Sequence, residues 1–254
     1  MEGLTLSLRE DSKAKRREVI LEAAKELMGS SQERSFSMRN LADLANVSIA
    51  TPYNLFGSKQ AILLAVLGEG QVRFEQALEA LDVDEIETLF QAPTLVAASY
   101  VENPDYHRSL ISAVYQNGGP DTYFNASISP FRLWKRLLGR ATEAGLLSPH
   151  VDADIFAATF GQLLLSHIVQ WAHGLTSLDE MEAHVHFGTS LILQAIATDK
   201  SRERLLLKMK DAEKELRSHW SVGLSERLQR GDLDRETRTL LADKLETTDI
   251  KEAS

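Results

Sequence analysis

The stretch FSMRNLADLANVSIATPYNLFGSKQAILLAV, residues 36–66, decides the fold that we expect for this chain. Apolar residues recur in it at helical spacing over residues 38–45, and a second short helix is expected over residues 48–56. Ser37 is placed to cap the first helix, and Asn46, which tolerates a left-handed backbone, follows its end. We therefore expect two short helices joined by a tight turn, the second of them closing at Gly57.

The start of the second helix is constrained by Pro52. Proline removes a backbone donor and disfavours helical geometry at the residue before it, so Pro52 has to lie in the first turn. Either Ser48 caps this helix and the opening turn is strained, or Thr51 caps it and Pro52 is the first helical residue. The sequence leaves both possibilities open. Ser58 is then expected to cap a longer helix that extends to about Leu81.

Two short helices joined by a tight turn form the helix-turn-helix arrangement, whose second helix lies in the DNA major groove. Small or hydroxylated residues near the start of such a helix let its backbone approach the phosphates. Here these residues are Ser48, Ala50 and Thr51. Tyr53 can reach a phosphate, Asn54 can hydrogen-bond to an adenine edge, and Phe56 is expected to point into the core.

Charge is distributed unevenly along the 254-residue chain, whose formal net charge is -9. Residues 1–64 carry nine basic and eight acidic side chains, whereas residues 65–199 carry six basic and 17 acidic ones. An acidic protein can therefore present one end that is suited to DNA. The basic cluster over residues 13–17 is either an arm that contacts DNA or a solvated start of the first helix.

Composition and motifs argue against several other classes of protein. The absence of Cys excludes disulfides and a cysteine nucleophile, which fits a reducing cytoplasm. The N-terminus lacks the apolar segment of a secretory signal, and polar residues interrupt the most apolar run, residues 155–172, so we expect a buried helix and no membrane contact. No phosphate loop, nucleophile elbow or acid pair is found, so neither an enzyme nor a cofactor is expected. The spacing of Glu180, Glu182, His184 and His186 is poor for a metal site.

The remaining periodicity predicts helices throughout, and the expected fold class is all-α. Ser12 is a possible cap of the first helix, Asp152 begins a long helix to about residue 174, and Ser177 opens another to about residue 197. One more helix is expected after Lys200, with a frayed tail over residues 243–254. Prolines are expected to separate the helices between residues 90 and 150, and these are Pro93, Pro104, Pro120, Pro130 and Pro149.

Residues 36–66 resemble the DNA-binding region of tetracycline-repressor (TetR) family transcriptional regulators. The matching features are the Ser-initiated helix, a hydrophobic turn followed by Ser, a small residue with Thr, then Tyr, Phe and a Ser-Lys pair. Asn46, Ile49 and Leu55 depart from residues that are common in the family. With the first helix, the resemblance spans about residues 12–70. It implies phosphate contacts by Ser37, Arg39, Ser48, Thr51, Tyr53 and Lys59, and base contacts by Ile49, Ala50 and Asn54.

The resemblance implies a DNA-binding domain over residues 1–64 and a ligand-binding and dimerisation domain over residues 65–199, followed by a charged extension over residues 200–254. Aromatic residues with polar tips suit a ligand pocket, although they can equally fill a core. The candidates are Tyr100, Tyr106, His107, Tyr115, Tyr123, Phe124, Phe131 and Trp134. A homodimer interface is implied for the last two helices of that domain, with these candidates: Phe160, Leu164, His167, Ile168, Trp171, His184, Phe187, Gly188, Leu191 and Ala195.

The function that we expect is a cytoplasmic, homodimeric transcriptional regulator that binds double-stranded operator DNA. A repressor released by a small-molecule effector is the leading hypothesis. An activator or architectural protein is an alternative. Another is a helical ligand-binding or scaffold protein with vestigial DNA binding, which Ile49 and Leu55 favour.

Overall fold

The structure, a computed structural model, describes the backbone of residues 2–29 and 36–230 and the side chains of residues 11–29 and 36–219. Helices account for the regular structure in these ranges, and the extended pairing in them is one isolated antiparallel bridge between Leu147 and Ala197. The expected all-α fold class is therefore confirmed. The predicted tail, residues 243–254, lies outside the described residues.

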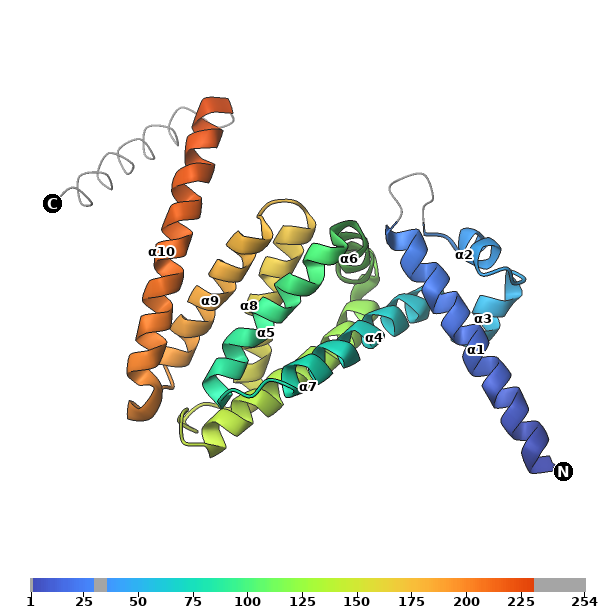
Figure 1. The fold of residues 1–254 in the computed structure, drawn as a ribbon, viewed down its shortest axis with the longest axis horizontal. Coiled ribbons are helices and arrows are strands. Elements are labelled where there is room, and N and C mark those ends of the chain that lie inside the picture. Colours follow the sequence, from blue (N-terminus) through green and yellow to red (C-terminus); the bar gives the residue numbers. More distant parts are fainter. Residues whose placement is uncertain (1, 30–35, 231–254) are drawn as a thin grey trace.

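Three helices and the start of a fourth form the N-terminal part of the protein (Figure 1). They are α1 (Glu2–Gly29), α2 (Met38–Leu44), α3 (Ala50–Phe56) and α4 (Lys59–Glu79). The expectation that Ser12 caps the first helix is wrong, because α1 begins ten residues earlier and Ser12 lies exposed inside it. Serine is tolerated in an exposed helix at a cost of only about 0.5 kcal/mol, so it does not force a start.

The caps of α2 and α4 are those that the sequence predicts. Ser37 Oγ accepts a hydrogen bond from the Asn40 amide at 3.1 Å, and Ser58 Oγ accepts one from the Ala61 amide at 3.1 Å. Asn46 has the left-handed φ of 52° that the tight turn requires, and Gly57 ends α3 with φ 86°. The path of the chain through the helix-turn-helix is thus set by local residues.

The larger part of the protein contains α5 (Glu85–Glu102), α6 (Pro104–Ile111), the π-helical turn η1 (Ser112–Gln116), α7 (Gly119–Glu143), α8 (Ala153–Ala172), α9 (Leu178–Gln194) and α10 (Asp199–Arg230). Pro104 and Pro120 lie in first turns, as expected. Pro93 and Pro130, however, lie inside α5 and α7, so the expectation that they separate helices is wrong. At Pro93 the reason is tertiary, because α5 is buried in the core on both sides of this residue.

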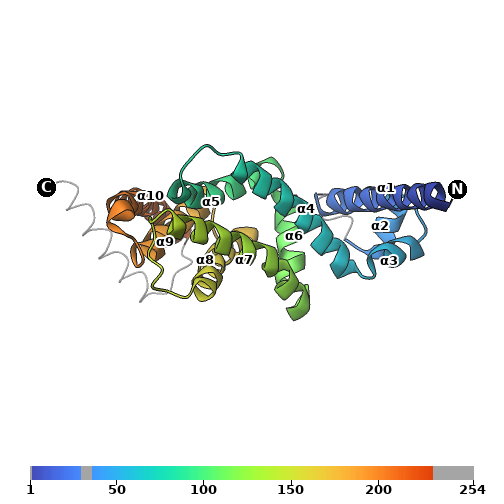
Figure 2. The same ribbon diagram turned by 90° about the horizontal axis from the view of Figure 1, so that it is seen from below.

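The molecule is elongated, with α1–α3 at one end and α10 at the other (Figures 1 and 2). Between these ends lies a core formed by α5, α7, α8 and α9, together with Leu205 of α10. A second core joins α1, α2 and the first half of α4 to α6 and η1. Helix α4 contributes to both, through Ile62 and Val66 in the N-terminal core and Leu78 in the larger one.

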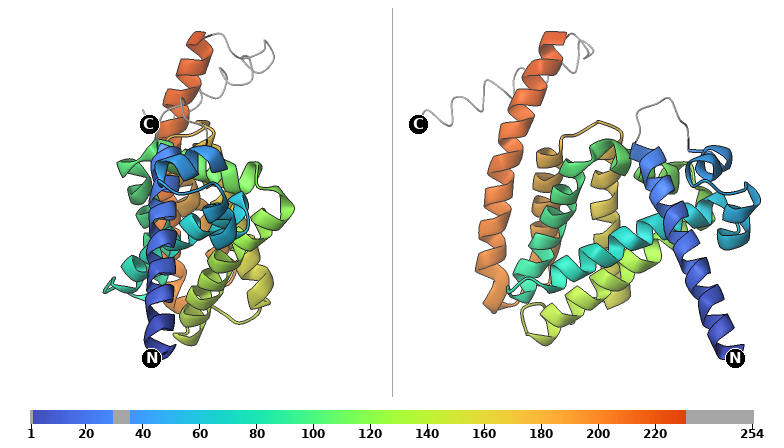
Figure 3. Two further views of the ribbon diagram at one scale, coloured as in Figure 1. Left: turned by 90° about the vertical axis from the view of Figure 1, so that its right-hand side faces the viewer. Right: turned by 45° about the vertical axis from the view of Figure 1, so that its right-hand side comes forward.

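Helix α10 is attached to the body of the protein by apolar and charged contacts. It runs alongside α9 and extends beyond it (Figure 3), and Leu205, Ala212 and Leu216 are buried. Arg204 forms a two-pronged ion pair with Asp84 at the start of α5. The hydrogen bond from Arg204 lowers the pKa of Asp84, against the opposing effect of burial. The first part of the predicted extension therefore belongs to the folded body.

Candidate nucleic-acid interface and effector region

The start of α3 differs from both arrangements that the sequence left open. Ile49 occupies the cap position, and no side chain caps the helix. The Thr51 amide donates to the Ser48 carbonyl at 2.9 Å, and the hydroxyl groups of these two residues lie 2.9 Å apart. Pro52 is the third residue of α3 and is buried. The amides of a first turn have no partner within their own helix, so proline costs no helical hydrogen bond there.

One side of the helix-turn-helix is exposed and carries no charge. Five residues on α3 or directly before it are exposed, namely Ser48, Ile49, Ala50, Tyr53 and Asn54. Ile49 is 54% exposed and Tyr53 48% exposed. Leu55 and Phe56, by contrast, pack against the N-terminal core, which agrees with the inward orientation expected for Phe56. The residues expected to face bases thus lie together on the free side of the helix.

Arg17 holds α3 against α1. Its Nη1 donates to the Leu55 carbonyl oxygen at 2.6 Å, and its guanidinium carbon lies 4.0 Å from the centre of the Phe56 ring. A hydrogen bond to the last turn of a helix and a cation–π contact both stabilise this arrangement. Lys13, Lys15 and Arg16 are instead exposed. Within the basic cluster, Arg17 therefore has a structural role, which could not be read from its charge.

The other residues expected at phosphates are differently engaged. Lys59 Nζ donates to the Phe36 carbonyl at 2.7 Å and lies 5.0 Å from the Phe36 ring, so part of its binding capacity is used inside the domain. The Ser37 hydroxyl accepts from the backbone as the cap of α2. Arg39 is exposed on α2. Among the charged candidates, Arg39 is thus the one whose side chain extends into solvent.

An open cavity of about 610 Å³ lies where α1 meets α4 and α6. Its lining consists of Glu22, Lys25, Glu26, Gly29, Arg73, Asn103 and Tyr106. Lys25 forms ion pairs there with Glu22 and Glu69, at 2.6 Å each. Tyr106 is the one predicted ligand-binding residue in this lining, which is mostly charged rather than aromatic.

Most of the other predicted ligand-binding residues gather around Trp171. The Tyr100 ring stacks on Trp171 with a centroid distance of 4.6 Å and lies 4.5 Å from the His107 ring. Tyr115 packs against the same cluster and meets Tyr123 edge-on at 5.7 Å. We refer to Tyr100, His107, Tyr115, Tyr123 and Trp171 as the aromatic cluster. It joins α5, α6, η1, α7 and α8.

Burial determines the protonation of the aromatic cluster. It raises the pKa of Tyr115 to about 12, with a contribution from Tyr123, and it raises the pKa of Tyr100 well above its usual value. It lowers the pKa of His107 to about 4, although a hydrogen bond with the Ser99 backbone opposes this shift. At neutral pH the cluster therefore offers uncharged hydroxyl and imidazole groups in apolar surroundings.

A π-helical turn supplies Tyr115. Such turns are rare and often occur at functional sites. Within η1, Val114 is fully buried in the N-terminal core, whereas the next residue, Tyr115, contacts that core and the aromatic cluster. Sequence periodicity gives no sign of this turn, because a single inserted residue does not alter the apolar pattern enough to be recognised.

Three predicted ligand-binding residues lie apart from the aromatic cluster. Trp134 is 2% exposed and packs against Phe160 with ring centroids 4.9 Å apart, so it fills the larger core. Phe124 is 69% exposed and points away from the adjacent Tyr123 contacts. Phe131 packs on the outside of the larger core. Aromatic composition does not distinguish a residue that fills a core from one that lines a site.

The predicted dimer residues divide between the interior and the surface of the protomer. Phe160, Leu164 and Trp171 are buried in the protomer, so their assignment to a dimer interface is wrong. Phe160 and Leu164 lie in the larger core, and Trp171 packs with Ala97, Ile111 and Met181. Ile168 packs partly against the same interior. His167 and His184 stack between α8 and α9 with ring centroids 5.0 Å apart.

The other α9 candidates are accessible. Phe187 and Gly188 are partly exposed, Ala195 is exposed and Leu191 is 55% exposed. A Cβ atom on Gly188 would lie 2.8 Å from Leu163 Cδ2, so the absence of a side chain lets α8 approach α9. Helix α8 is long and apolar enough to cross a membrane by length and composition, and only 28% of its apolar window is buried inside the protomer, so the expected burial of this helix is not complete within one protomer.

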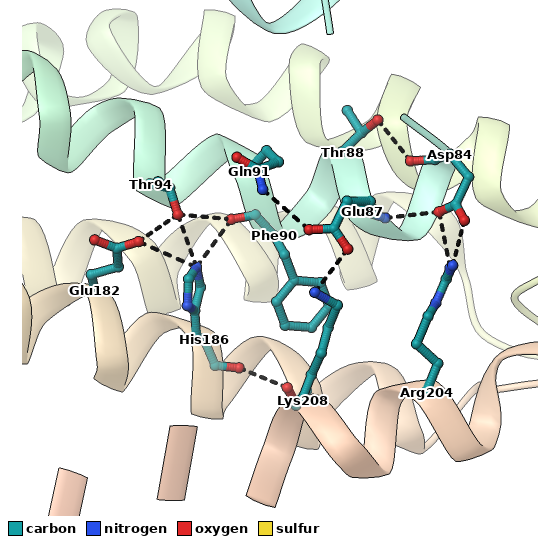
Figure 4. Close-up of polar contacts among 11 residues, drawn as sticks. Asp84, Glu87, Thr88, Phe90, Gln91, Thr94, Glu182, His186, Arg204 and Lys208 are labelled. Atoms are coloured by element: carbon teal, nitrogen blue, oxygen red, sulfur yellow. Dashed lines mark hydrogen bonds and ion pairs between the residues drawn. The ribbon is translucent and has the colours of Figure 1, made fainter. Parts of the chain in front are cut away.

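A polar network between α5 and α9 was missed by sequence reasoning (Figure 4). His186 Nε2 lies 3.0 Å from the Phe90 carbonyl oxygen and 3.3 Å from Thr94 Oγ1, and Thr94 also donates to Glu182. Proline inside a helix disturbs the carbonyl groups of the preceding turn, and Pro93 follows Phe90 by three residues. In the described residues no three potential metal ligands converge.

The fold and this interface define a class: a helix-turn-helix DNA-binding domain attached to a helical regulatory domain. Residues 20–66 match the family described as bacterial regulatory proteins, tetR family. This match confirms the resemblance to the tetR family that is seen in the sequence of the N-terminal region. No curated protein matches the chain as a whole.

Solved structures of TetR-family regulators share the fold of most of this chain. Thermus thermophilus FadR, a repressor in complex with lauroyl-CoA, has a TM-score of 0.61 and 20% identity, covering 72% of this chain and 95% of its own. RolR in complex with resorcinol has a TM-score of 0.57 and 16% identity, covering 82% and 95%. A regulator from Rhodococcus sp. has a TM-score of 0.57 and 19% identity, covering 71% and 97%. At these identities the likeness establishes the fold alone.

We predict that Arg17→Ala loosens α3. The variant loses a charged hydrogen bond and a cation–π contact, together on the order of 1–2 kcal/mol. Hydrogen exchange should show reduced protection of the α3 amides, and thermal unfolding should occur at a lower temperature. Arg16→Ala is the matched control, because Arg16 is exposed beside Arg17. Equal protection of α3 in both variants would contradict the role assigned to Arg17.

Proposed function

We propose that this protein is a homodimeric transcriptional repressor that binds double-stranded operator DNA through α2 and α3 and releases it when a small molecule binds at the aromatic cluster. The observation that carries this proposal is the uncharged, exposed side of α3 in a domain that matches the tetR family. A regulator rather than an enzyme is proposed, acting in the cytoplasm where its DNA lies.

The interface provides different kinds of DNA contact. Tyr53 projects from the exposed side of α3, where its hydroxyl group can bind a phosphate, and Arg39 extends from α2. Phosphate contacts position a protein on the duplex, whereas contacts to base edges give specificity. Asn54 carries the amide that can pair with adenine. A repressor role is supported by the fold shared with a regulator described as a repressor.

Coupling between effector and DNA is supported by two shared elements. Helix α4 begins next to α3 and ends in the larger core, where Arg136 of α7 forms ion pairs with Glu75 at 2.9 Å and with Glu79 at 3.3 Å. In η1, Val114 and Tyr115 join the N-terminal core to the aromatic cluster. A ligand that displaces Tyr115 would therefore press on the core that positions α3. Such a rigid-body shift changes the spacing of the two recognition helices of a dimer.

The chemistry of the aromatic cluster suits an uncharged, partly aromatic or apolar effector with a few hydrogen-bonding groups. Its hydroxyl and imidazole groups are neutral at neutral pH, because burial shifts their pKa values away from 7. Proteins that share this fold bind lauroyl-CoA in one case and resorcinol in another. These two ligands differ widely in structure. The fold therefore does not determine which ligand binds, and the residues that line the site have to determine it.

A homodimer is proposed through the outer side of α8 and α9. Ile155 is 67% exposed and Leu191 is 55% exposed there, and little of the apolar window of α8 is buried in the protomer. Exposed apolar surface of this kind usually marks an interface. The outer side of α8 also carries exposed Thr159, Gln162 and Ser166, which suit a protein partner better than lipid.

We expect Tyr53→Ala to weaken binding to all duplexes similarly, because it removes a proposed phosphate contact while leaving the core intact. Asn54→Ala should instead reduce discrimination between duplexes, by about 1–3 kcal/mol at one base pair. Fluorescence anisotropy with duplexes from the DNA upstream of the gene measures both effects. If the wild type binds none of these duplexes more tightly than an unrelated sequence, the proposed function is wrong.

Leu191→Glu should convert the dimer to monomers, because it places a charge on the proposed interface. Val101→Glu is the control, since Val101 is 65% exposed and lies on α5, outside the two helices of the proposed interface. Sedimentation should show monomers for the first variant and dimers for the second. Trp171→Glu is not a useful test, because Trp171 is 1% exposed and its replacement would disrupt the fold. A dimeric Leu191→Glu variant would exclude this interface.

The effector is expected to bind more weakly to the operator complex than to the free protein, typically by 5- to 150-fold, because coupling is reciprocal. Thermal-shift screening of phenols, aromatic acids and acyl thioesters identifies a stabilising compound, and calorimetry with and without saturating operator measures the coupling. Tyr123→Ala should weaken its binding, whereas Phe124→Ala, which changes the adjacent exposed residue, should not. Equal affinities with and without operator would contradict an effector-released repressor.

A further inference from the structure

We propose that the recognition helix reads thymine methyl groups, with Ile49 as the residue that determines this specificity, and that the contacted part of the operator consists of A·T pairs. This inference rests on the proposed function and names the DNA that the interface selects. It comes from three features of the described interface: the chemistry of the exposed residues, the internal engagement of the nearby cations, and the position of Ile49.

The exposed residues lack the side chains that read guanine. Arg or Lys binding to the O6 and N7 atoms of guanine is the commonest specific contact in the major groove, and Glu or Asp reads cytosine. Ser48, Ile49, Ala50, Tyr53 and Asn54 include neither an acid nor a base. Two of them can read an A·T pair: an amide binds adenine, and an apolar side chain contacts the C5-methyl group of thymine.

The nearest cations are held away from the exposed side. Arg17 donates to the Leu55 carbonyl behind α3, and Lys59 donates to the Phe36 carbonyl. Each bond fixes a charge that could otherwise have reached into the groove beside the helix. To contact a guanine, Arg17 or Lys59 would have to break a hydrogen bond that stabilises the domain.

The position of Ile49 is suited to a base contact. It occupies the cap of α3, where side chains of a recognition helix meet base edges, and 54% of its surface is exposed. Leu55 and Phe56 on the opposite side supply the packing of α3, so the core does not require an apolar residue at position 49. Ala50 lies beside it, and Asn54 follows Ala50 by four residues, one helical turn further along. That turn advances about 5–6 Å, which is one to two base-pair steps at about 3.4 Å each.

The experiment uses full-length protein and a duplex that the protein itself selects from a random pool. Each thymine is replaced in turn by uracil, which removes the methyl group and keeps the base pair. We expect one or two positions at which the replacement weakens binding about three- to fourfold, the loss expected for one buried methyl group. At these positions Ile49→Ala should bind the thymine and uracil duplexes equally.

Tyr53→Phe is the matched control on the same side of α3. It should weaken binding to thymine and uracil duplexes by the same factor and thus retain the methyl effect. Thermal unfolding checks that Ile49→Ala stays folded, as its exposure predicts. Three results would overturn the inference: selection of a G·C pair that Arg39 or another cation reads, the absence of any methyl-sensitive thymine, or the same methyl effect in Ile49→Ala. Each of these results would leave the proposed DNA-binding function standing. Failure to select any duplex would overturn the proposed function itself.

Discussion

The packing of α4 is the constraint on which the rest of the structure depends. Ile62 and Val66 are completely buried among α1 and α2, while Leu78, three turns later, is buried in the larger core. Gly68 and Gly70 lie between these segments without neighbours that need the space of a side chain. Because one continuous helix serves two cores, neither can shift without the other. The proposed coupling between effector and DNA relies on this shared helix, whose first end lies next to α3.

Charged contacts hold both ends of the molecule, and they act at helix termini. Arg17 donates to a carbonyl in the last turn of α3, and Arg204 binds Asp84, whose carboxylate also caps α5 at the Glu87 amide. Exposed ion pairs stabilise proteins by less than about 1 kcal/mol. These contacts matter here because they fix orientation. Each contact holds its helix at one angle to the neighbouring helix, which apolar contacts alone would define less sharply. The part of α10 up to Leu216 is consequently a structural element of the body, within the region that the sequence marked as a charged helical extension.

Local features made the N-terminal domain predictable from sequence. Its caps and turns depend on contacts between residues at most four positions apart, so the local sequence is enough to predict them. These features are the caps at Ser37 and Ser58 and the turns at Asn46 and Gly57. The continuity of α5 through Pro93 and the division of aromatic residues between cluster and core depend on distant contacts. Trp134 and Trp171 illustrate this, since both are buried tryptophans in apolar helices and only their neighbours, Phe160 and Tyr100, distinguish them. The π-helical turn has no sequence signal of this kind.

Residues 47–58, which form α3 and its flanking turns, can lack charge because charged groups from other segments hold them in place. Arg17, from a helix nearly forty residues away, neutralises the carboxyl end of α3 and covers Phe56. With its inner side satisfied by Leu55, Phe56 and Arg17, α3 needs no polar residue of its own to stay in place. Folding therefore places no requirement on the outer side of α3. The identities of Ile49, Ala50, Tyr53 and Asn54 depend only on the molecule that binds there. The protein has a net charge of -9, but exposed basic side chains lie in the same domain, on α1 and α2. Attraction at a distance can therefore come from these neighbouring helices, whereas α3 itself offers shape, hydroxyl groups and apolar contact.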